Sequence, residues 1–410
     1  MMNRDQEDCL ARVGPGSRMA RLFREYWVPA AVSATLEADG APQRVRLFGE
    51  NYVVWRSTDG TVGFLDEACP HRGASLALAR NERNSLICIY HGWRFDTAGR
   101  LLEAPCEGAN PRLQAFLDSV HAESYPVREG GGMVWVYLGK RKPAPPFPLF
   151  EFNTLPATHV HAKRAVLNYN WLQGLEAHLD AAHLGVLHGS TVVGGGSNDR
   201  DVDLAVKNLS PKMEMDDTRY GMREAALRDM PDGFVYARMR QLVLPCFTMV
   251  PTAPGSPLSG RAIVPIDDEH TAEWYFIYRI ESPVTDAEIH RLWKGSDPDP
   301  RDFAANLGSP EDMWHQNRDA MREGHWTGLT RNVPFEDFIV SSSMGVRTNR
   351  AKEHLGMSDA VLVHARKALL DAIDQFEKSG EPPWQAGVDF STIRATTRRL
   401  AHGEDWRPAT

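Results

Sequence analysis

The sequence predicts an α+β fold in two parts, an all-β N-terminal domain and a larger domain of mixed helices and strands. Three observations predict it. Short alternating segments joined by tight turns fill the first third of the chain, and the proline-rich stretch RKPAPPFPLF follows them. Beyond that stretch, helical patterns are interspersed with strand patterns. We therefore place the two domains at residues 1–143 and 144–410.

Within the first domain, SRMARLFREYW has apolar residues spaced for one face of a helix. The segment QRVRLFGENYVVWRSTDGTVGFLDEA then reads as strands with turns at residues 49–51 and 58–60. The strand pattern continues to GGMVWVYLGK, directly before the proline-rich connector. These segments predict a domain of short strands preceded by one short helix.

The second domain begins with a helical pattern from Trp171 to His188, followed by a predicted loop at Gly194–Gly196. Two strand-rich segments follow, FVYARMRQLVLPCFTMV and TAEWYFIYRI. The segment SDAVLVHARKALLDAIDQFEK near the C-terminus predicts a long amphipathic helix. This mixture of elements is typical of an α+β domain.

Composition limits the classes of function. The 410 residues are 42% hydrophobic and 24% charged, which suffices for two substantial cores, and the net charge of -8 argues mildly against a nucleic-acid partner. Neither a signal peptide nor an apolar run of membrane-spanning length is visible, so we expect a soluble, cytoplasmic protein. The five cysteines are odd in number and scattered, which favours reduced thiols and metal ligands over a disulfide framework.

Two of the cysteines lie close to histidines. Cys69 and His71 form C-x-H, Cys88 and His91 form C-x-x-H, and sixteen residues separate the two motifs. A two-iron, two-sulfide cluster of Rieske type needs two thiolates on one iron and two imidazoles on the other. Two facing hairpin tips would supply them. The alternative is a structural zinc site, although such sites more often present their cysteines in pairs.

A second group of potential ligands lies in NWLQGLEAHLDAAHLGVLHGS, where Asp180, His183 and His188 form D-x-x-H-x-x-x-x-H. Five residues apart on a regular helix, the two histidines would point about 140° away from each other. They reach one metal only if the helix ends or loosens between them, and Gly185 is placed to permit this. Two histidines and a carboxylate are the ligands of non-haem Fe(II) oxygenases. The alternative is a helix with histidines packed in a core.

The segments REYWVPAA, CPHRG and CIYHGWRFDTAGR resemble the Rieske oxygenases, and the resemblance extends over nearly the whole chain. QGLE, VPIDDEHT, SMG and EHLG resemble the phthalate dioxygenase-like branch, whose α subunits work without a β subunit. The resemblance implies a catalytic domain with an antiparallel sheet and helices that carry the iron ligands. It also implies that Cys69 and Cys88 bind the inner iron of the cluster, and His71 and His91 the outer iron.

The resemblance implies further residue roles. In PFEDFIVSSSMG, Asp337 matches the third ligand of the mononuclear iron, with Glu336 as the alternative, and we expect this carboxylate on a solvated loop. Asp180 matches a residue that bridges His183 to the cluster histidine of a neighbouring subunit, here His91, and this bridge requires a homotrimer or stacked trimers. His178 is either a pocket residue or an exposed helix position.

The expected activity is that of a terminal oxygenase with one 2Fe-2S cluster and one Fe(II) per chain, which hydroxylates or dihydroxylates an aromatic carboxylate, substituted benzoate or aryl ether with O2. The chain carries no nucleotide-binding motif and no plant-type cluster motif, so electrons must come from a separate NAD(P)H-dependent reductase. Arg223, Arg238 and Arg261 are candidates for holding an anionic substrate, and the resemblance favours Arg223 and Arg261. The alternatives are an O- or N-demethylating monooxygenase of the same architecture and a Rieske electron carrier without oxygenase activity.

Overall fold

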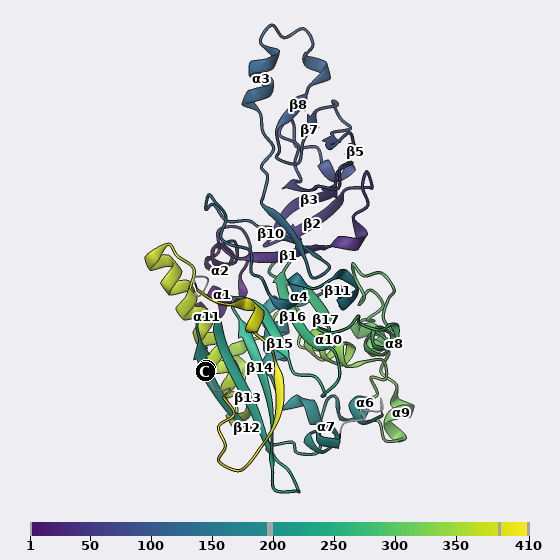
Figure 1. The fold of residues 1–410 in the computed structure, drawn as a ribbon, viewed down its shortest axis with the longest axis vertical. Coiled ribbons are helices and arrows are strands. Elements are labelled where there is room, and N and C mark those ends of the chain that lie inside the picture. The colour runs from purple at the N-terminus through teal and green to yellow at the C-terminus, as the bar shows by residue number, and fades with distance from the viewer. Residues whose placement is uncertain (1, 195–199, 384–386, 408–410) are drawn as a thin grey trace.

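The computed structural model describes residues 2–194, 200–383 and 387–407. Figure 1 shows two lobes, with the small strands of the N-terminal lobe at the top and a large sheet with its helices below. Across the described residues, no helix has both the length and the apolar character that crossing a membrane requires. The two-part α+β architecture predicted from the sequence is confirmed.

The N-terminal lobe contains three small antiparallel sheets and the helix α3 (Leu113–Ser119). They are β1-β10-β9, β2-β3-β4 and β5-β6-β7-β8, with the bounds β1 Trp27–Val32, β2 Gln43–Leu47, β3 Glu50–Arg56, β4 Val62–Asp66, β5 Arg80–Glu82, β6 Ser85–Ile87, β7 Arg94–Phe95, β8 Leu101–Glu103, β9 Val127–Gly130 and β10 Met133–Tyr137. The turn predicted at residues 58–60 joins β3 to β4, whereas the turn between β2 and β3 is Phe48–Gly49, so Glu50 and Asn51 of the turn predicted at residues 49–51 belong to β3. A separate small core beside β3 and β4 contains Cys69 and Cys88.

An eight-stranded antiparallel sheet forms the second lobe, in the order β11-β17-β16-β15-β14-β13-β12, with β18 paired to β14. Its strands are β11 Val160–Leu167, β12 Lys212–Thr218, β13 Gly221–Asp229, β14 Val235–Val243, β15 Phe247–Val250, β16 Leu258–Pro265, β17 Thr271–Tyr278 and β18 Thr396–Leu400. Arg261 on β16 lies directly opposite Tyr275 on β17, and Ile263 lies opposite Glu273. Because alternate residues of a strand share a face, these four side chains lie on one face of the sheet.

Among the described residues of this lobe, the longer helices are α5 (Trp171–Leu179), α10 (Val333–Ser343) and α11 (Ala360–Ser379). The predicted C-terminal helix is α11. The shorter helices are α4 Glu151–Thr154, α6 Gly189–Gly194, α7 Arg200–Ala205, α8 Asp286–Leu292 and α9 Arg318–Arg322. Gly194 thus ends α6, whereas the rest of the predicted Gly194–Gly196 loop lies outside the described residues.

The helix predicted from Trp171 to His188 is wrong in length, because α5 ends at Leu179. Asp180 has an extended backbone (ψ 118°), and its Oδ1 accepts a 2.7 Å hydrogen bond from the N–H of Ala182. An aspartate side chain that binds a nearby backbone N–H competes with helix propagation. A short 3-10 turn, His183–Gly185, follows, so His183 and His188 do not share one regular helix.

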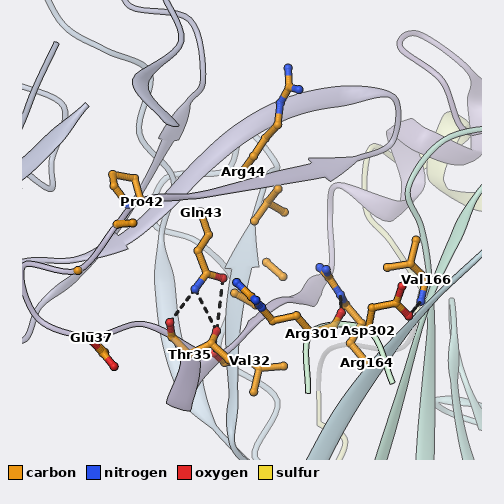
Figure 2. A pocket seen from close by; sticks show the side chains of 15 residues that line it. Val32, Thr35, Glu37, Pro42, Gln43, Arg44, Arg164, Val166, Arg301 and Asp302 are labelled. Atoms are coloured by element: carbon orange, nitrogen blue, oxygen red, sulfur yellow. Dashed lines mark hydrogen bonds between the residues drawn. The ribbon is translucent and has the colours of Figure 1, made fainter. Parts of the chain in front are cut away.

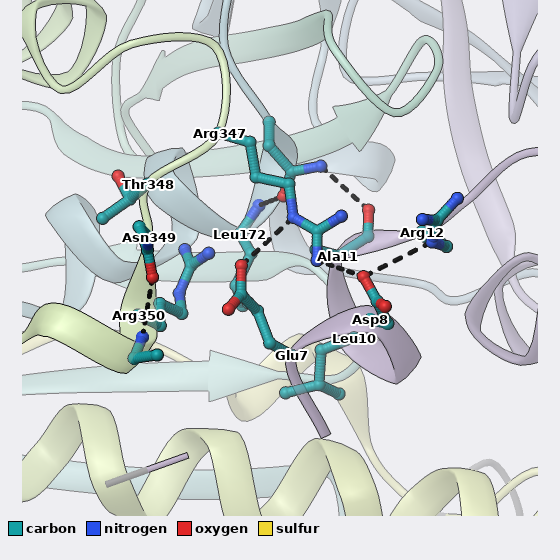
Figure 3. A network of polar contacts seen from close by, with 12 residues as sticks. Glu7, Asp8, Leu10, Ala11, Arg12, Leu172, Arg347, Thr348, Asn349 and Arg350 are labelled. Atoms are coloured by element: carbon teal, nitrogen blue, oxygen red, sulfur yellow. Dashed lines mark hydrogen bonds and ion pairs between the residues drawn. The ribbon is translucent and has the colours of Figure 1, made fainter. Parts of the chain in front are cut away.

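The first helices of the chain, α1 (Arg4–Ala11) and α2 (Arg18–Phe23), share one core with α5 and α11 of the second lobe. Asn170, at the start of α5, donates a 2.8 Å bond to the carbonyl of Ala11. Figure 3 shows Arg347, from the loop after α10, bonded to Glu7 and Asp8 of α1. The predicted boundary at residues 143/144 falls between β10 and α4, but these N-terminal helices pack on the second lobe.

A cavity of about 580 Å³ lies at the junction of the two lobes (Figure 2). The segment from β1 to β2 lines one side, and β11 with Arg301 and Asp302 lines the other. Arg44 is already bonded to Glu67, and Arg301 to Asp299. The cavity contains none of the histidines or cysteines predicted to bind metal.

Candidate functional site

The two Cys-His loops have the same backbone structure. The N–H of Cys69 and that of Cys88 each donate to the carbonyl five residues later, both at 2.8 Å. Gly73 and Gly92, four residues after each cysteine, donate back to the cysteine carbonyls at 2.8 and 2.9 Å. Both glycines have positive φ angles, +76° and +72°, which residues other than glycine adopt rarely. The sequence therefore builds two equivalent hairpin tips, and each presents one cysteine and one histidine.

At these tips the cysteines point inward and the histidines lie side by side. Cys69 and Cys88 are buried, and burial raises the pKa of Cys69 to about 11. The rings of His71 and His91 are 4.5 Å apart, and His71 stacks on Trp93. Nδ1 of His91 is buried and has no hydrogen-bond partner within the described ranges. An orphaned imidazole nitrogen beside buried thiols fits a metal cluster with mixed Cys and His ligands.

A third thiol, that of Cys106, approaches the loop that contains His91. Sγ of Cys106 lies 3.8 Å from the carbonyl oxygen of His91, and the Cys106 side chain is exposed. The two loops themselves contain no cysteine besides Cys69 and Cys88. Cys106 comes from fifteen residues further along the chain, and no local pattern in the sequence signals this approach.

The second ligand group consists of His183, His188 and Asp337, whose ligand atoms all lie within 4.8 Å of one another. Oδ1 of Asp337 is 2.9 Å from Nε2 of His188 and 3.5 Å from Nε2 of His183. On the far side of each ring, Nδ1 faces another carboxylate, at 2.7 Å for His188 and 3.2 Å for His183. With each Nδ1 as the donor, both Nε2 atoms are acceptors aimed at a carboxylate oxygen. One proton can satisfy only one of these contacts, whereas one divalent cation satisfies all three atoms.

The charges at this site are coupled. Burial alone would lower the pKa of His188, but the carboxylates of Asp337 and Glu336 outweigh it and raise the pKa to about 9. Burial alone would raise the pKa of Asp337, but His188 and His183 lower it well below its usual range. The site thus favours a cation between these groups, as a metal-binding site does.

Asp337 lies on helix α10, which corrects the solvated loop expected for it. Asn332 caps this helix by accepting a 3.0 Å bond from the N–H of Phe335, and Pro334 is in its first turn. Phe335 and Phe338 are buried and hold the helix against the core. The Asn-x-Pro start followed by apolar residues was a signal from which the sequence could have predicted this helix.

Glu336, the alternative third ligand, has a different position from Asp337. Its carboxylate is 0% exposed, and its Oε2 bonds Nδ1 of His188. Its Oε1 accepts hydrogen bonds from the hydroxyls of Thr191 at 2.9 Å and Thr327 at 3.1 Å. A fully bonded carboxylate behind a histidine fixes the tautomer and the orientation of the ring. Glu336 thus orients His188, and Asp337 faces the position where a metal would bind.

Asp180 and Gly185 shape the turn that carries His183. Oδ2 of Asp180 is 3.2 Å from Nδ1 of His183, and both side chains are partly exposed. A Cβ atom on Gly185 would lie 2.3 Å from the carbonyl oxygen of Val206. Gly185 therefore permits close packing of a second backbone segment, rather than ending the helix as the sequence suggested.

Comparisons with known proteins agree with this geometry. Residues 26–126 match the family described as "Rieske [2Fe-2S] domain", and residues 136–409 match "LigXa C-terminal domain like". The 3-chlorobenzoate-3,4-dioxygenase oxygenase subunit of Comamonas testosteroni is 32% identical, and the alignment covers 100% of this chain and 97% of that protein. The phthalate 4,5-dioxygenase oxygenase subunit of Pseudomonas putida is 33% identical, with 99% and 94% covered.

The chain belongs to the Rieske oxygenases. It is an oxygenase subunit, hence an oxidoreductase that acts with O2, and its N-terminal lobe is a Rieske [2Fe-2S] domain. Among solved structures, the Pseudomonas putida CBB5 NdmA QL mutant with theobromine aligns with a TM-score of 0.62 at 18% identity, covering 96% of this chain and 100% of that chain. This likeness supports the fold.

In this oxygenase, Arg261 lies on the sheet face that α5 covers. Tyr275 lies opposite Arg261, and its hydroxyl oxygen is 3.3 Å from Nε2 of His178 on α5. The guanidinium carbon of Arg261 is 3.9 Å from the centre of the Tyr275 ring. Nη1 of Arg261 bonds the hydroxyl of Ser259, while Nε is buried without a partner within the described parts of the chain. Arg261 thus retains a buried N–H donor that no described residue accepts from.

Arg223 does not reach this face. It is paired with Asp216 at 2.6 Å and lies near the ring of Trp406. The next residue, Glu224, bonds Arg240, which in turn donates to the carbonyl of Leu179 at the end of α5. Because neighbouring residues of a strand point to opposite faces, Arg223 points away from α5. The third candidate, Arg238, donates to the carbonyl of Pro251 at 2.7 Å.

His178 is a buried residue of the oxygenase rather than an exposed helix position. Its Nε2 is 2.7 Å from Oε2 of Glu273, and Oε1 of the same carboxylate accepts a 2.7 Å bond from the hydroxyl of Tyr169. Glu273 is fully buried. The resulting Tyr-Glu-His group packs α5 onto the sheet next to Tyr275 and Arg261.

Proposed function

We propose that this oxygenase hydroxylates or dihydroxylates an aromatic carboxylate, with a mononuclear Fe(II) held by His183, His188 and Asp337. The main observation in support is that two imidazole nitrogens and one carboxylate oxygen lie within 4.8 Å of one another. When bound, the cluster supplies electrons and the mononuclear iron supplies the oxygen chemistry. The protein residues orient these ligands and bind the substrate.

A carboxylate on the substrate is supported by Arg261. Its guanidinium is buried, stacks on Tyr275 and retains an unbonded Nε, so an anion entering this region gains a charge-assisted hydrogen bond. Burial lowers the pKa of Arg261, and an anionic ligand would compensate this burial. The two named relatives, a 3-chlorobenzoate and a phthalate dioxygenase subunit, are both named for aromatic carboxylates.

Electron transfer between subunits is supported by the arrangement of the lobes. The strands that flank the cluster loops lie in the upper lobe of Figure 1, whereas α10, with Asp337, lies in the lower lobe. Asp180 and His183 are partly exposed, and Ile89 and Tyr90 beside His91 are exposed apolar residues. We propose that the cluster tip of one subunit docks on Asp180 of the next, so that Asp180 contacts the partner subunit's His91. A homotrimer, or two stacked trimers, provides such contacts in every subunit.

The electron donor is proposed to be a separate NAD(P)H-dependent reductase with flavin and iron-sulfur groups, in the cytoplasm. The cluster histidines lie at an exposed tip with Tyr90, and Arg72 lies above the Tyr90 ring. This tip offers both a cation and an aromatic surface for a transient electron-transfer contact.

The test measures iron and acid-labile sulfide in anaerobically purified protein, for wild type and His183→Ala. About three irons and two sulfides per chain should fall to about two irons and two sulfides, because only the mononuclear site loses a ligand. Two irons in both proteins would indicate an electron carrier and would overturn the proposal.

The substrate is then tested with a surrogate reductase, a panel of benzoates and phthalates, and their methoxy derivatives. A hydroxylated or cis-diol product with incorporated ¹⁸O from ¹⁸O2 is the expected result. Release of formaldehyde from a methoxy substrate as the main reaction would instead identify a demethylating monooxygenase.

A further inference from the structure

Two buried arginines, Arg228 and Arg240, bond backbone carbonyls next to Asp180. Arg240 on β14 is 6% exposed, and its Nη1 donates to the carbonyl of Leu179 at 3.2 Å. Arg228 on β13 is 1% exposed, and its Nη2 donates to the carbonyl of Ala181 at 2.9 Å. The two carbonyls flank Asp180 on either side along the chain.

These contacts occur where α5 ends. The last carbonyls of a helix lack partners within the helix, and arginine side chains from the sheet bond two of the carbonyls in this segment. Nε of Arg228 also donates to the carbonyl of Asn208 at 3.1 Å. The segment around Asn208 is the one that packs against Gly185, so Arg228 joins both backbone segments around the His183 turn.

The arrangement carries an energetic cost. Glu224 is buried and pairs with Arg240 at 2.9 Å. Arg228 forms no ion pair with any residue that the structure describes, and burial together with Arg238 and Arg240 lowers its pKa to about 10. A whole buried ion pair can often be replaced by apolar side chains without loss of stability, whereas removing one partner alone is destabilising. Charged groups retained at such a cost point to a need for geometry rather than for stability.

We infer that Arg228 and Arg240 are positioning residues that hold the backbone on both sides of Asp180, and thereby fix its carboxylate against His183. This inference rests on the proposed function, in which Asp180 carries the contact between the cluster of one subunit and the iron of the next. Through Arg228 and Arg240, the sheet then keeps Asp180 in place when the partner subunit docks.

The experiment uses the holoenzyme with substrate, reduced at the cluster and mixed with O2. The measured quantity is the rate at which the cluster absorbance returns, together with iron content and KM. Arg228→Met and Arg240→Met should keep about three irons and an unchanged KM, while the rate falls about tenfold or more, because small misplacements are costly. Arg228→Lys and Arg240→Lys should recover part of the rate, since lysine still donates to a carbonyl.

Arg223→Met is the matched control, because Arg223 lies on the same strand as Arg228 but points to the opposite face. Its rate should equal that of wild type. If the methionine variants do not fold, the lysine variants test the inference instead. A slower return of the cluster absorbance than in wild type, with normal iron content and KM, then supports it.

Wild-type rates in the variants at Arg228 and Arg240, alongside a slow Asp180→Asn, would overturn the inference and leave the proposed bridge intact. A wild-type rate in Asp180→Asn itself would remove the bridge and the inference together. Loss of iron with an unchanged rate per remaining iron would show that the arginines support metal binding only, and would also overturn it.

Discussion

Glu336 holds His188 through a 2.7 Å contact between Oε2 and Nδ1, and both side chains are almost completely buried. Two threonine hydroxyls complete the bonding of the carboxylate. Nε2 of His188 is thereby aimed at Asp337, the next residue after Glu336. Consecutive residues of α10 thus play two roles, since one orients a ligand and the other is proposed to be a ligand.

Glu336→Gln should lower the affinity for mononuclear iron about 10- to 100-fold, because the amide cannot fix the imidazole as the carboxylate does. Iron and sulfide per chain after dialysis against a chelator measure the effect, with sulfide expected to stay at two. Glu404→Gln, on the surface, is the control and should behave as wild type. Unchanged iron in Glu336→Gln would contradict the role of this carboxylate.

Asp180→Asn should keep both metal sites and slow electron transfer from the cluster about 10- to 100-fold, since the bridging carboxylate is lost. Cluster reoxidation in a single turnover measures the rate, and iron analysis shows whether the sites remain loaded. Turnover at the wild-type rate would exclude Asp180 as the bridge.

Arg261→Ala should raise KM for an aromatic acid about 10- to 100-fold, the equivalent of one lost charge-assisted hydrogen bond. KM for the methyl ester of the same acid should change much less. Arg223→Ala should affect neither, because its guanidinium pairs with Asp216 on the other face of the sheet. Equal losses for acid and ester in Arg261→Ala would count against recognition of a carboxylate.

His161 on β11 should make the protein sensitive to mild acid. Burial, with Lys163 nearby, lowers the pKa of His161 to about 4, against about 6.5 in an unfolded chain. Between these values the unfolded chain binds a proton that the folded protein does not, so the free energy of unfolding falls as the pH falls. His161→Gln should therefore lose less Tm than wild type between pH 7 and pH 5.

His402→Gln, at an exposed position, is the control and should show the wild-type change in Tm. A His161→Gln protein with the wild-type dependence on pH would show that other groups control the acid sensitivity.

The residues proposed as cluster ligands could be picked out from the sequence because each hairpin tip is a local structure. Cys69 and His71 are two residues apart, Cys88 and His91 are three apart, and a glycine with a positive φ closes each turn. The identities and spacing of such residues determine the loop geometry before any distant contact forms. His183 and His188 also lie on one short segment, but the helix predicted through both of them ends at Leu179, and Gly185 between them packs against the backbone of Val206.

Other features depended on tertiary structure. Whether a strand residue faces the active site depends on the register of the whole sheet, because a shift by one residue exchanges the faces. Arg223 and Arg261 look alike in the sequence, yet only Arg261 lies on the face that α5 covers.

Sequence alone therefore determined the two-part α+β class and pointed to the two groups of potential metal ligands, because these follow from local spacing and periodicity. Only the tertiary structure decided that Glu336 orients His188, that Arg261 rather than Arg223 faces α5, and that Arg228 and Arg240 lie beneath Asp180. Those contacts join segments between about 50 and 150 residues apart. No local pattern specifies which side chains meet when a sheet and its helices pack together.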